Sequence, residues 1–403
     1  MGSLAVSIAN QPCFDALIKA AHCGGRVKGL THNYYAYPAR FSPQFVKASI
    51  ETFTKAGDLV LDPFLGGGTT AVEARANSRF FIGSDISELA VYIAQVKSNP
   101  LRRREVEHLV KRSNDFFTFV KGSKTPKGEF PDARNLESHE ATELVRKIML
   151  ALEWTQELDN KRLQDFGRCA ILRTAQIVIN GQKELPGPDA FDSTLGRVFV
   201  SMLSSAEDYR RVVLLADKHC TQEMGRRTRL INTPAACLPE LLKGKLRILP
   251  KLIITSPPYP GVHVLYHRWQ LLGGKETSLP FYIANKQDGK GLSHYCMHAR
   301  SNDNGDRYFS LIRETFEAMR KLVDDDATVV QLVAFSKPEF QLQRYLSVME
   351  QSGFYSIQNS SGLDEHHSSW QRAVPSRKWY THLNAANKVT GGREYLLIHK
   401  PIL

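Results

Sequence analysis

The sequence predicts an α/β protein with a doubly wound sheet and a mainly helical inserted module. Three observations support this. A strand, a glycine-rich loop, a helix and a second strand follow one another between residues 59 and 85. Strand patterns at 229–234, 252–254, 327–333, 355–357 and 394–399 alternate with helical patterns at 307–321 and 342–351. Between these halves, residues 101–227 carry helical runs and few strand-like alternations. Alternating strands and helices are typical of a doubly wound sheet.

The first strand pattern, residues 59–61, ends at an Asp-Pro pair and continues into a glycine loop. This segment reads Asp62-Pro63-Phe64-Leu65-Gly66-Gly67-Gly68-Thr69-Thr70 and leads into a helical pattern. Glycines permit positive φ and a close approach of backbone to a ligand, and the following helix offers unpaired N–H groups. A second strand pattern at 80–85 ends in Asp85, at about the spacing where an acidic residue meets ribose hydroxyls in dinucleotide folds. Helical patterns at 42–53 and 88–96 flank this βαβ unit.

Three kinds of ligand compete for this loop. A P-loop site requires a lysine directly after the glycines, but Thr69 and Thr70 stand there. The spacing Gly66-x-Gly68-x-x-Ala71 does match the dinucleotide fingerprint. However, Asp62 at the strand end is a poor neighbour for a pyrophosphate and a good one for the ammonium or sulfonium of S-adenosylmethionine. The charge therefore favours a methyl donor.

A second motif, Thr255-Ser256-Pro257-Pro258-Tyr259, directly follows the apolar run 252–254. Each proline fixes its own φ and disfavours helix in the residue before it, so the turn is held extended. The Ser256 hydroxyl and the Pro257 carbonyl can accept hydrogen bonds from a planar amine, and Tyr259 offers a stacking face to a flipped base. Taken alone, such a turn is more often a strand terminator with an aromatic plug.

The two motifs together, with Gly83-Ser84-Asp85-Ile86, resemble the amino-group DNA methyltransferases, specifically those whose Ser-Pro-Pro-Tyr motif goes with N4-methylation of cytosine. The segment 32–41 resembles the part of that family that precedes the first strand and closes over the cofactor. Residues 265–269, which follow the Ser-Pro-Pro-Tyr turn, also resemble that family. The resemblance implies a Rossmann-like methyltransferase sheet with its cofactor half first. It divides the chain into a catalytic domain, residues 1–100 and 228–403, and a helical insertion, 101–227, that is a candidate target-recognition region.

The resemblance also implies a role for individual residues. The predicted catalytic residues are Ser256, Pro257, Pro258 and Tyr259. The predicted S-adenosylmethionine-binding residues are Tyr37, Pro38, Ala39, Asp62, Pro63, Phe64, Gly66, Gly68, Thr69, Thr70, Asp85, Ile86 and Thr255. The predicted DNA-binding residues are Arg268, Trp269, Arg377, Lys378, Arg226 and Arg227. The long stretch 273–306, rich in Gly, Asn, His and Tyr, is predicted to be a loop that touches DNA.

Composition favours a polyanionic partner. The 403 residues carry a formal net charge of +12, which suits double-stranded DNA better than a neutral metabolite. The arginine clusters at 102–104, 210–211 and 226–229 suit phosphate contacts. The six cysteines form no Cys-x-x-Cys pair, so no metal site is expected, and the missing Pro-Cys dipeptide argues against methylation at a ring carbon. Without a membrane-spanning run, we expect a cytoplasmic, nucleoid-associated, prokaryotic protein.

The residues leave other functions open. The nearest alternatives are an N6-adenine DNA methyltransferase, since adenine offers a similar exocyclic amine, and an RNA base amino-methyltransferase. Two more distant ones are a non-catalytic DNA-binding module and a dinucleotide-dependent oxidoreductase. The sequence leaves open whether a cognate restriction endonuclease or another defence-system partner exists. No motif predicts the target DNA sequence.

Overall fold

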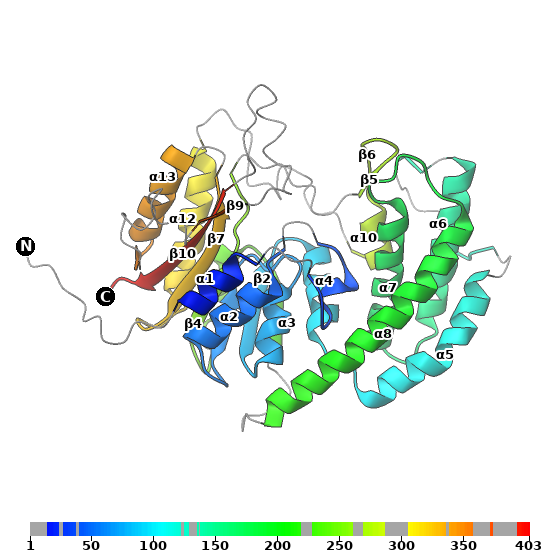
Figure 1. Ribbon diagram of the computed structural model, residues 1–403, viewed down its shortest axis with the longest axis horizontal. Helices are drawn as coiled ribbons and strands as arrows, with labels where there is room; N and C mark the ends of the chain where they lie inside the picture. The colour runs from blue at the N-terminus through cyan, green and yellow to red at the C-terminus, as the bar shows by residue number, and fades with distance from the viewer. Residues whose placement is uncertain are drawn as a thin grey trace, which may run out of the picture.

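The computed structural model describes residues 14–23, 27–37, 40–121, 125–128, 135–136, 138–218, 228–260, 269–286, 305–335, 338–357, 371–373 and 393–403. Figure 1 shows two parts side by side: a twisted sheet with helices on both faces, and a group of long helices next to it. The predicted doubly wound α/β fold with a helical insertion is confirmed.

The sheet has eight strands, in the order β3-β2-β1-β4-β7-β10-β8, and β9 pairs with β10. Their bounds are β1 (Leu59–Asp62), β2 (Phe80–Asp85), β3 (Thr228–Asn232), β4 (Pro250–Thr255), β7 (Thr328–Ala334), β8 (Phe354–Ser356), β9 (Gln371–Ala373) and β10 (Arg393–Pro401). The strands from β3 to β7 run parallel, whereas β10 is antiparallel to β7, β8 and β9. The carboxyl ends of the parallel strands and the amino end of β10 therefore lie at one edge.

Both faces of the sheet are covered, which explains its nearly continuous apolar strands. One face packs against α1 (Asp15–Ala21), α2 (Pro43–Phe53) and α3 (Thr69–Ala76), and α4 (Glu88–Ser98) adds Ala94 to that core. The other face packs against α9 (Leu238–Leu242), α12 (Asp306–Arg320) and α13 (Pro338–Gln351). Along β4, Leu252 and Ile254 face the first layer and Ile253 faces the second, as the period of two in a strand requires. Figure 1 shows the two layers on opposite faces.

The inserted module is built from α5 (Arg103–Lys121), α6 (His139–Gln156), α7 (Lys161–Ile179) and α8 (Pro188–Lys218). Its core is mainly aliphatic and includes buried aromatic rings, of which those of Phe116 and Trp154 lie 4.2 Å apart between centroids. After α8 the chain returns to the sheet through β3, which pairs with β2. The insertion therefore leaves the sheet before this strand, as the strand pattern at 229–234 predicts.

The stretch after the catalytic turn differs from the predicted loop. Residues 269–286 form a hairpin of β5 (Trp269–Leu271) and β6 (Lys275–Thr277), followed by α10 (Leu279–Ala284). Leu271, Leu279 and Phe281 complete the core of the helical module, and the Gly181 N–H donates to the Gln270 carbonyl at 2.6 Å. The expectation of a loop from residue 273 is wrong up to 286, because the few apolar side chains here are buried against α7. The remainder, 287–304, lies outside the described residues.

The helical module is fixed to the catalytic part through α8. Arg75 of α3 donates from Nη1 and Nη2 to the two carboxylate oxygens of Asp217, at 2.6 and 2.9 Å. Both side chains are largely buried, so the bidentate geometry satisfies charges that would otherwise be costly. Tyr209 adds a hydrogen bond from its hydroxyl to the Ser98 carbonyl at 3.2 Å.

Within the described part of the chain, no helix has the length and apolarity needed to span a membrane.

Candidate active site at the carboxyl edge of the sheet

The two sequence motifs meet at the carboxyl edge because their strands are neighbours. The strand β1 ends at Asp62 and pairs in parallel with β4, which ends at Thr255. The glycine loop and the Ser-Pro-Pro-Tyr turn therefore leave the same edge from adjacent positions. Ligands of open α/β sheets bind at this edge.

Asp62 accepts hydrogen bonds from several residues at this edge. Its carboxylate accepts hydrogen bonds from Thr70 Oγ1 at 2.7 Å, Thr255 Oγ1 at 2.8 Å and the Phe64 N–H at 3.1 Å. The side chain is buried. Burial raises the pKa of Asp62 to about 6, while these hydrogen bonds oppose the shift. Asp62 thus ties the glycine loop and α3 to β4.

The glycine loop packs closely against α4 on one side and Tyr37 on the other. Gly68 has a φ of +73°, and a Cβ added there would lie 2.6 Å from the Ala94 Cβ of α4. A Cβ added at Gly67 would lie 2.7 Å from the Tyr37 Cβ. Only glycine fits these positions without movement. Tyr37, predicted in the segment that closes over the cofactor, therefore lies directly against the loop.

Asp85 ends β2 beside this loop. Its carboxylate accepts from the Gly66 N–H at 2.8 Å and from the Ser87 N–H at 2.9 Å, and the Ile86 backbone also donates to it. Burial raises the pKa of Asp85 to about 6. The acidic side chain predicted to meet ribose hydroxyls therefore stands within one hydrogen bond of the glycines.

These residues fit S-adenosylmethionine. Thr69 begins α3, whose first N–H groups lie at the loop. Asp85 is partly exposed and offers carboxylate oxygens for ribose. Pro63 lies in the same turn, where its carbonyl accepts from Ser84 Oγ at 3.2 Å. Phe64 packs partly buried against the second core layer.

The Ser-Pro-Pro-Tyr turn is connected to a residue that the sequence reasoning missed. Ser256 Oγ donates to Tyr259 Oη at 3.3 Å, and Tyr259 Oη donates to Glu394 Oε1 at 3.2 Å. Tyr259 is 7% exposed and Glu394 only 2%. The signal for Glu394 is faint: one carboxylate at the start of the apolar strand pattern 394–399.

Lys97 is a second residue without a sequence signal. Its buried Nζ donates to the Gly67 carbonyl at 3.0 Å and to the Tyr35 carbonyl at 3.3 Å. Burial lowers the pKa of Lys97 to about 7. Nearby, His32 Nε2 lies 2.7 Å from Glu73 Oε1 of α3. Lys97 thus joins the segment before the first strand to the glycine loop, and His32 joins that segment to α3.

Of the predicted DNA-binding residues, Trp269 is the one that lies within the described part of the chain. Trp269 is buried and donates from Nε1 to Tyr35 Oη at 3.0 Å. This corrects the expectation for Trp269, whose indole is held in the core of the helical module. Pro38, Ala39, Arg226, Arg227, Arg268, Arg377 and Lys378 lie outside the described residues. Arg210 and Arg211 both donate to Glu207, which offsets the charge of that cluster.

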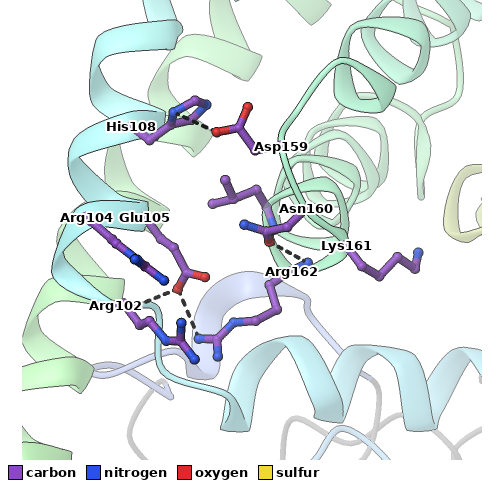
Figure 2. A pocket seen from close by; sticks show the side chains of 9 residues that line it. Arg102, Arg104, Glu105, His108, Asp159, Asn160, Lys161 and Arg162 are labelled. Carbon is purple, nitrogen blue, oxygen red and sulfur yellow. Dashed lines mark hydrogen bonds and ion pairs between the residues drawn. The ribbon is translucent and has the colours of Figure 1, made fainter.

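A pocket of about 700 Å³ lies elsewhere, between the beginnings of α5 and α7 (Figure 2). Arg162 and Glu105 pair across it at 3.2 Å, and His108 and Asp159 at 3.4 Å. Residues after the other end of α7 contact the β5–β6 hairpin. The pocket, which includes the predicted phosphate contacts Arg102 and Arg104, therefore belongs to the helical module and not to the carboxyl edge.

Among the described residues, no group of three or more His, Cys, Asp or Glu side chains is arranged to hold a metal ion.

Comparisons with known proteins agree with this site. A DNA methylase family model for N6 and N4 enzymes matches residues 19–96, which span the glycine loop and Asp85. Type II methyltransferase M.MvaI of Kocuria varians is 21% identical over 409 residues, covering 90% of this chain and 88% of the relative. Type II methyltransferase M.MjaII of Methanocaldococcus jannaschii is 29% identical over 134 residues, covering 33% of this chain and 24% of the relative. The motifs, the fold and these relatives together make the chain similar to the S-adenosylmethionine-dependent amino-group DNA methyltransferases, which comprise the N6 and N4 enzymes.

Proposed function

We propose that this DNA methyltransferase transfers the methyl group of S-adenosylmethionine to the exocyclic N4 amine of a cytosine flipped out of double-stranded DNA. One observation carries the choice of cytosine. The side chain that heads the Pro-Pro-Tyr turn at the end of β4 is the hydroxyl of Ser256 and not a carboxylate.

In this proposal the cofactor lies over the edge formed by β1 and β2. Asp85 and Ile86 bind its ribose, the backbone of Gly66 and Gly68 lies beneath it, and Tyr37 covers the loop. Asp62, Pro63, Phe64, Thr69, Thr70 and Thr255 hold the shape of the loop. When bound, the cofactor supplies an electrophilic methyl group on a sulfonium. The acidic end of β1, at Asp62, suits that positive charge.

The target amine binds at the neighbouring turn. Its lone pair is delocalised into the ring, so the nitrogen becomes nucleophilic only when its N–H groups are held by acceptors. Ser256 has one hydroxyl hydrogen, donated to Tyr259 Oη, and retains lone pairs for the amine. The Pro257 carbonyl is the second acceptor, and Pro258 keeps the turn extended. Holding the amine in line with the methyl group accounts for most of the acceleration, since orientation contributes about 7 to 11 kcal/mol.

The flipped base requires a stacking surface and a bound duplex. Unstacking costs a few kcal/mol, and stacking on an aromatic ring such as Tyr259 returns about 1 to 3 kcal/mol. The net charge of +12 supports binding to DNA phosphates. The helical module shares its core with residues 269–284, which follow the catalytic turn. In this proposal the module contacts the target sequence.

The relatives also bear on the biological setting. Two of them are named as type II methyltransferases. We therefore propose that this chain protects a DNA site that a cognate restriction endonuclease cleaves.

Identification of the methylated nucleoside tests the proposal. The full chain is incubated with labelled S-adenosylmethionine and either unmethylated plasmid DNA or total RNA. Each product is then digested to nucleosides and analysed by mass. We expect N4-methylcytosine in DNA and no label in RNA. N6-methyladenine or 5-methylcytosine would contradict the assignment of the base, and label in RNA alone would contradict the assignment of the substrate.

A further inference from the structure

We infer that Glu394 is the acceptor of the proton that leaves the methylated amine, and that Ser256 and Tyr259 relay this proton to it. The inference rests on the proposed function, since it takes the Ser256 turn as the place where the amine binds. It adds a residue from the last strand of the sheet to the catalytic apparatus.

The hydrogen bonds run in one direction. Ser256 Oγ donates to Tyr259 Oη at 3.3 Å, and Tyr259 Oη donates to Glu394 Oε1 at 3.2 Å. Each hydroxyl therefore points its hydrogen toward the carboxylate and leaves lone pairs on the side of the preceding group. A proton taken up by Ser256 Oγ can move to Glu394 by two transfers along these hydrogen bonds, with no rotation of a hydroxyl beforehand.

The topology of the sheet places Glu394 there. In the register of β10 with β7, Glu394 lies opposite Ala334, the last residue of β7. Because β10 is antiparallel, its beginning lies at the edge where the parallel strands end. The strand β7 also pairs with β4, whose end is Thr255. A carboxylate 135 positions from Tyr259 is thereby held within hydrogen-bond reach of it.

The reaction needs such an acceptor. Transfer of the methyl group forms a bond from N4 to carbon and breaks the bond from that carbon to sulfur. The nitrogen is then positively charged and must lose one proton. In the relay, Ser256 Oγ takes this proton and gives its own to Tyr259 Oη, which gives its own to Glu394. The products are a neutral methylated base, a neutral thioether and a protonated carboxyl group.

Other bases near the turn are less suitable. A serine hydroxyl alone is a weak base and cannot retain the proton. The Asp62 carboxylate already accepts from Thr70, Thr255 and the Phe64 N–H. Its hydroxyl partners, Thr70 and Thr255, donate toward Asp62 and belong to the start of α3 and the end of β4. Glu394 is a carboxylate that accepts directly from Tyr259, which in turn accepts from the predicted amine acceptor Ser256.

Single-turnover methylation at saturating DNA and cofactor tests the relay. The variants are Glu394→Gln, Tyr259→Phe, their double variant and Glu394→Asp, and Glu350→Gln on the exposed side of α13 is the control. Glutamine keeps an oxygen acceptor for Tyr259 but removes the base. We expect Glu394→Gln to lower the rate about 100-fold or more. Tyr259→Phe should lower it similarly and the double variant no further, because both interrupt one pathway.

Two readouts separate a proton acceptor from a residue that only orients Tyr259. The KM values for DNA and for S-adenosylmethionine should change less than about threefold in Glu394→Gln, and Glu394→Asp should recover part of the rate. The wild-type rate should also be slower in D₂O than in H₂O, a measurement that does not depend on the folding of any variant. An unchanged rate in Glu394→Gln, additive losses in the double variant, or no solvent isotope effect would each overturn the relay.

Failure of the relay is distinguishable from failure of the proposed function. If Ser256→Ala is inactive while Glu394→Gln is fully active, the amine site stands and the relay is removed. If Ser256→Ala keeps full turnover, the amine site itself is wrong. The mass of the product nucleoside reports separately which base is methylated.

Discussion

Thr255 Oγ1 donates to Asp62 Oδ1 at 2.8 Å, across 193 positions of sequence. The bond joins the ends of β4 and β1, which carry the two halves of the candidate site. Since Asp62 also accepts from Thr70 Oγ1, the same carboxylate holds the beginning of α3. In the proposed function, one buried group thus helps to position both the methyl donor and the target amine, and errors of about 1 Å in such positioning are costly to the rate.

Ser256→Ala should separate methyl transfer from cofactor binding. Loss of the hydroxyl removes an acceptor for the amine, so we expect the rate of methyl transfer to DNA to fall about 100-fold or more. The affinity for S-adenosylmethionine, measured by calorimetry, should stay within about twofold, because the glycine loop is untouched. Ser310→Ala, at an exposed position of α12, is the matched control. Normal turnover in Ser256→Ala would show that the amine does not bind at this turn.

Asp85→Asn should weaken cofactor binding. The carboxylate accepts from the Gly66 and Ser87 N–H groups, and a hydrogen bond to a charged group contributes about 1.5 to 3 kcal/mol. We expect the dissociation constant of S-adenosylmethionine in calorimetry to rise about tenfold or more. Asp208→Asn, exposed on α8, controls for the change in charge. Equal affinities of Asp85→Asn and wild type would remove Asp85 from the cofactor site.

Gly68→Ala should lower the free energy of unfolding by more than the strain of a left-handed alanine accounts for. The new Cβ would lie 2.6 Å from the Ala94 Cβ, so α4 or the loop must move. Gly244→Ala is the control, since Gly244 has a similar φ of +67° with no atom within 4 Å of its added Cβ. A left-handed alanine costs about 1 to 2 kcal/mol. We expect that loss for Gly244→Ala in urea unfolding, and a larger loss with weaker cofactor binding for Gly68→Ala. Equal losses would contradict tight packing of the loop on α4.

Asp62→Asn should change how stability depends on pH. Burial raises the pKa of Asp62 to about 6 from the usual aspartate value of about 4, so between these values the folded chain binds the proton more readily than the unfolded chain. The contribution of this carboxyl to stability therefore falls as the pH rises from about 4 to 6 and stays low above that. The unfolding free energy of wild type minus that of Asp62→Asn should fall by about 2 kcal/mol from pH 4 to pH 7. Urea unfolding of both proteins at several pH values measures this, and a constant difference would show that Asp62 is not buried as a titrating group.

The local sequence was sufficient for the main strands of the sheet and the two motifs. The apolar runs at 252–254 and 327–333, and the Asp-Pro and glycine signals at 62–68, predict strands and a loop without knowledge of their partners. The loop predicted from residue 273 was partly wrong because short apolar elements such as β5, β6 and α10 acquire their structure by packing on α7. Trp269 was misassigned for the same reason, since its burial depends on the distant Tyr35.

By itself, the sequence determined the fold class, the order of the two halves and the methyltransferase motifs, because each rests on residues close together in the chain. Tertiary structure alone decided that Asp62 and Thr255 share a hydrogen bond, that Lys97 supports Gly67, and that Glu394 ends the chain from Ser256. These contacts depend on the order and direction of strands in the sheet, which bring distant positions to one edge. No local pattern of side chains predicts such contacts, so a lone Glu at the start of an apolar strand pattern does not indicate that its carboxylate will contact Tyr259.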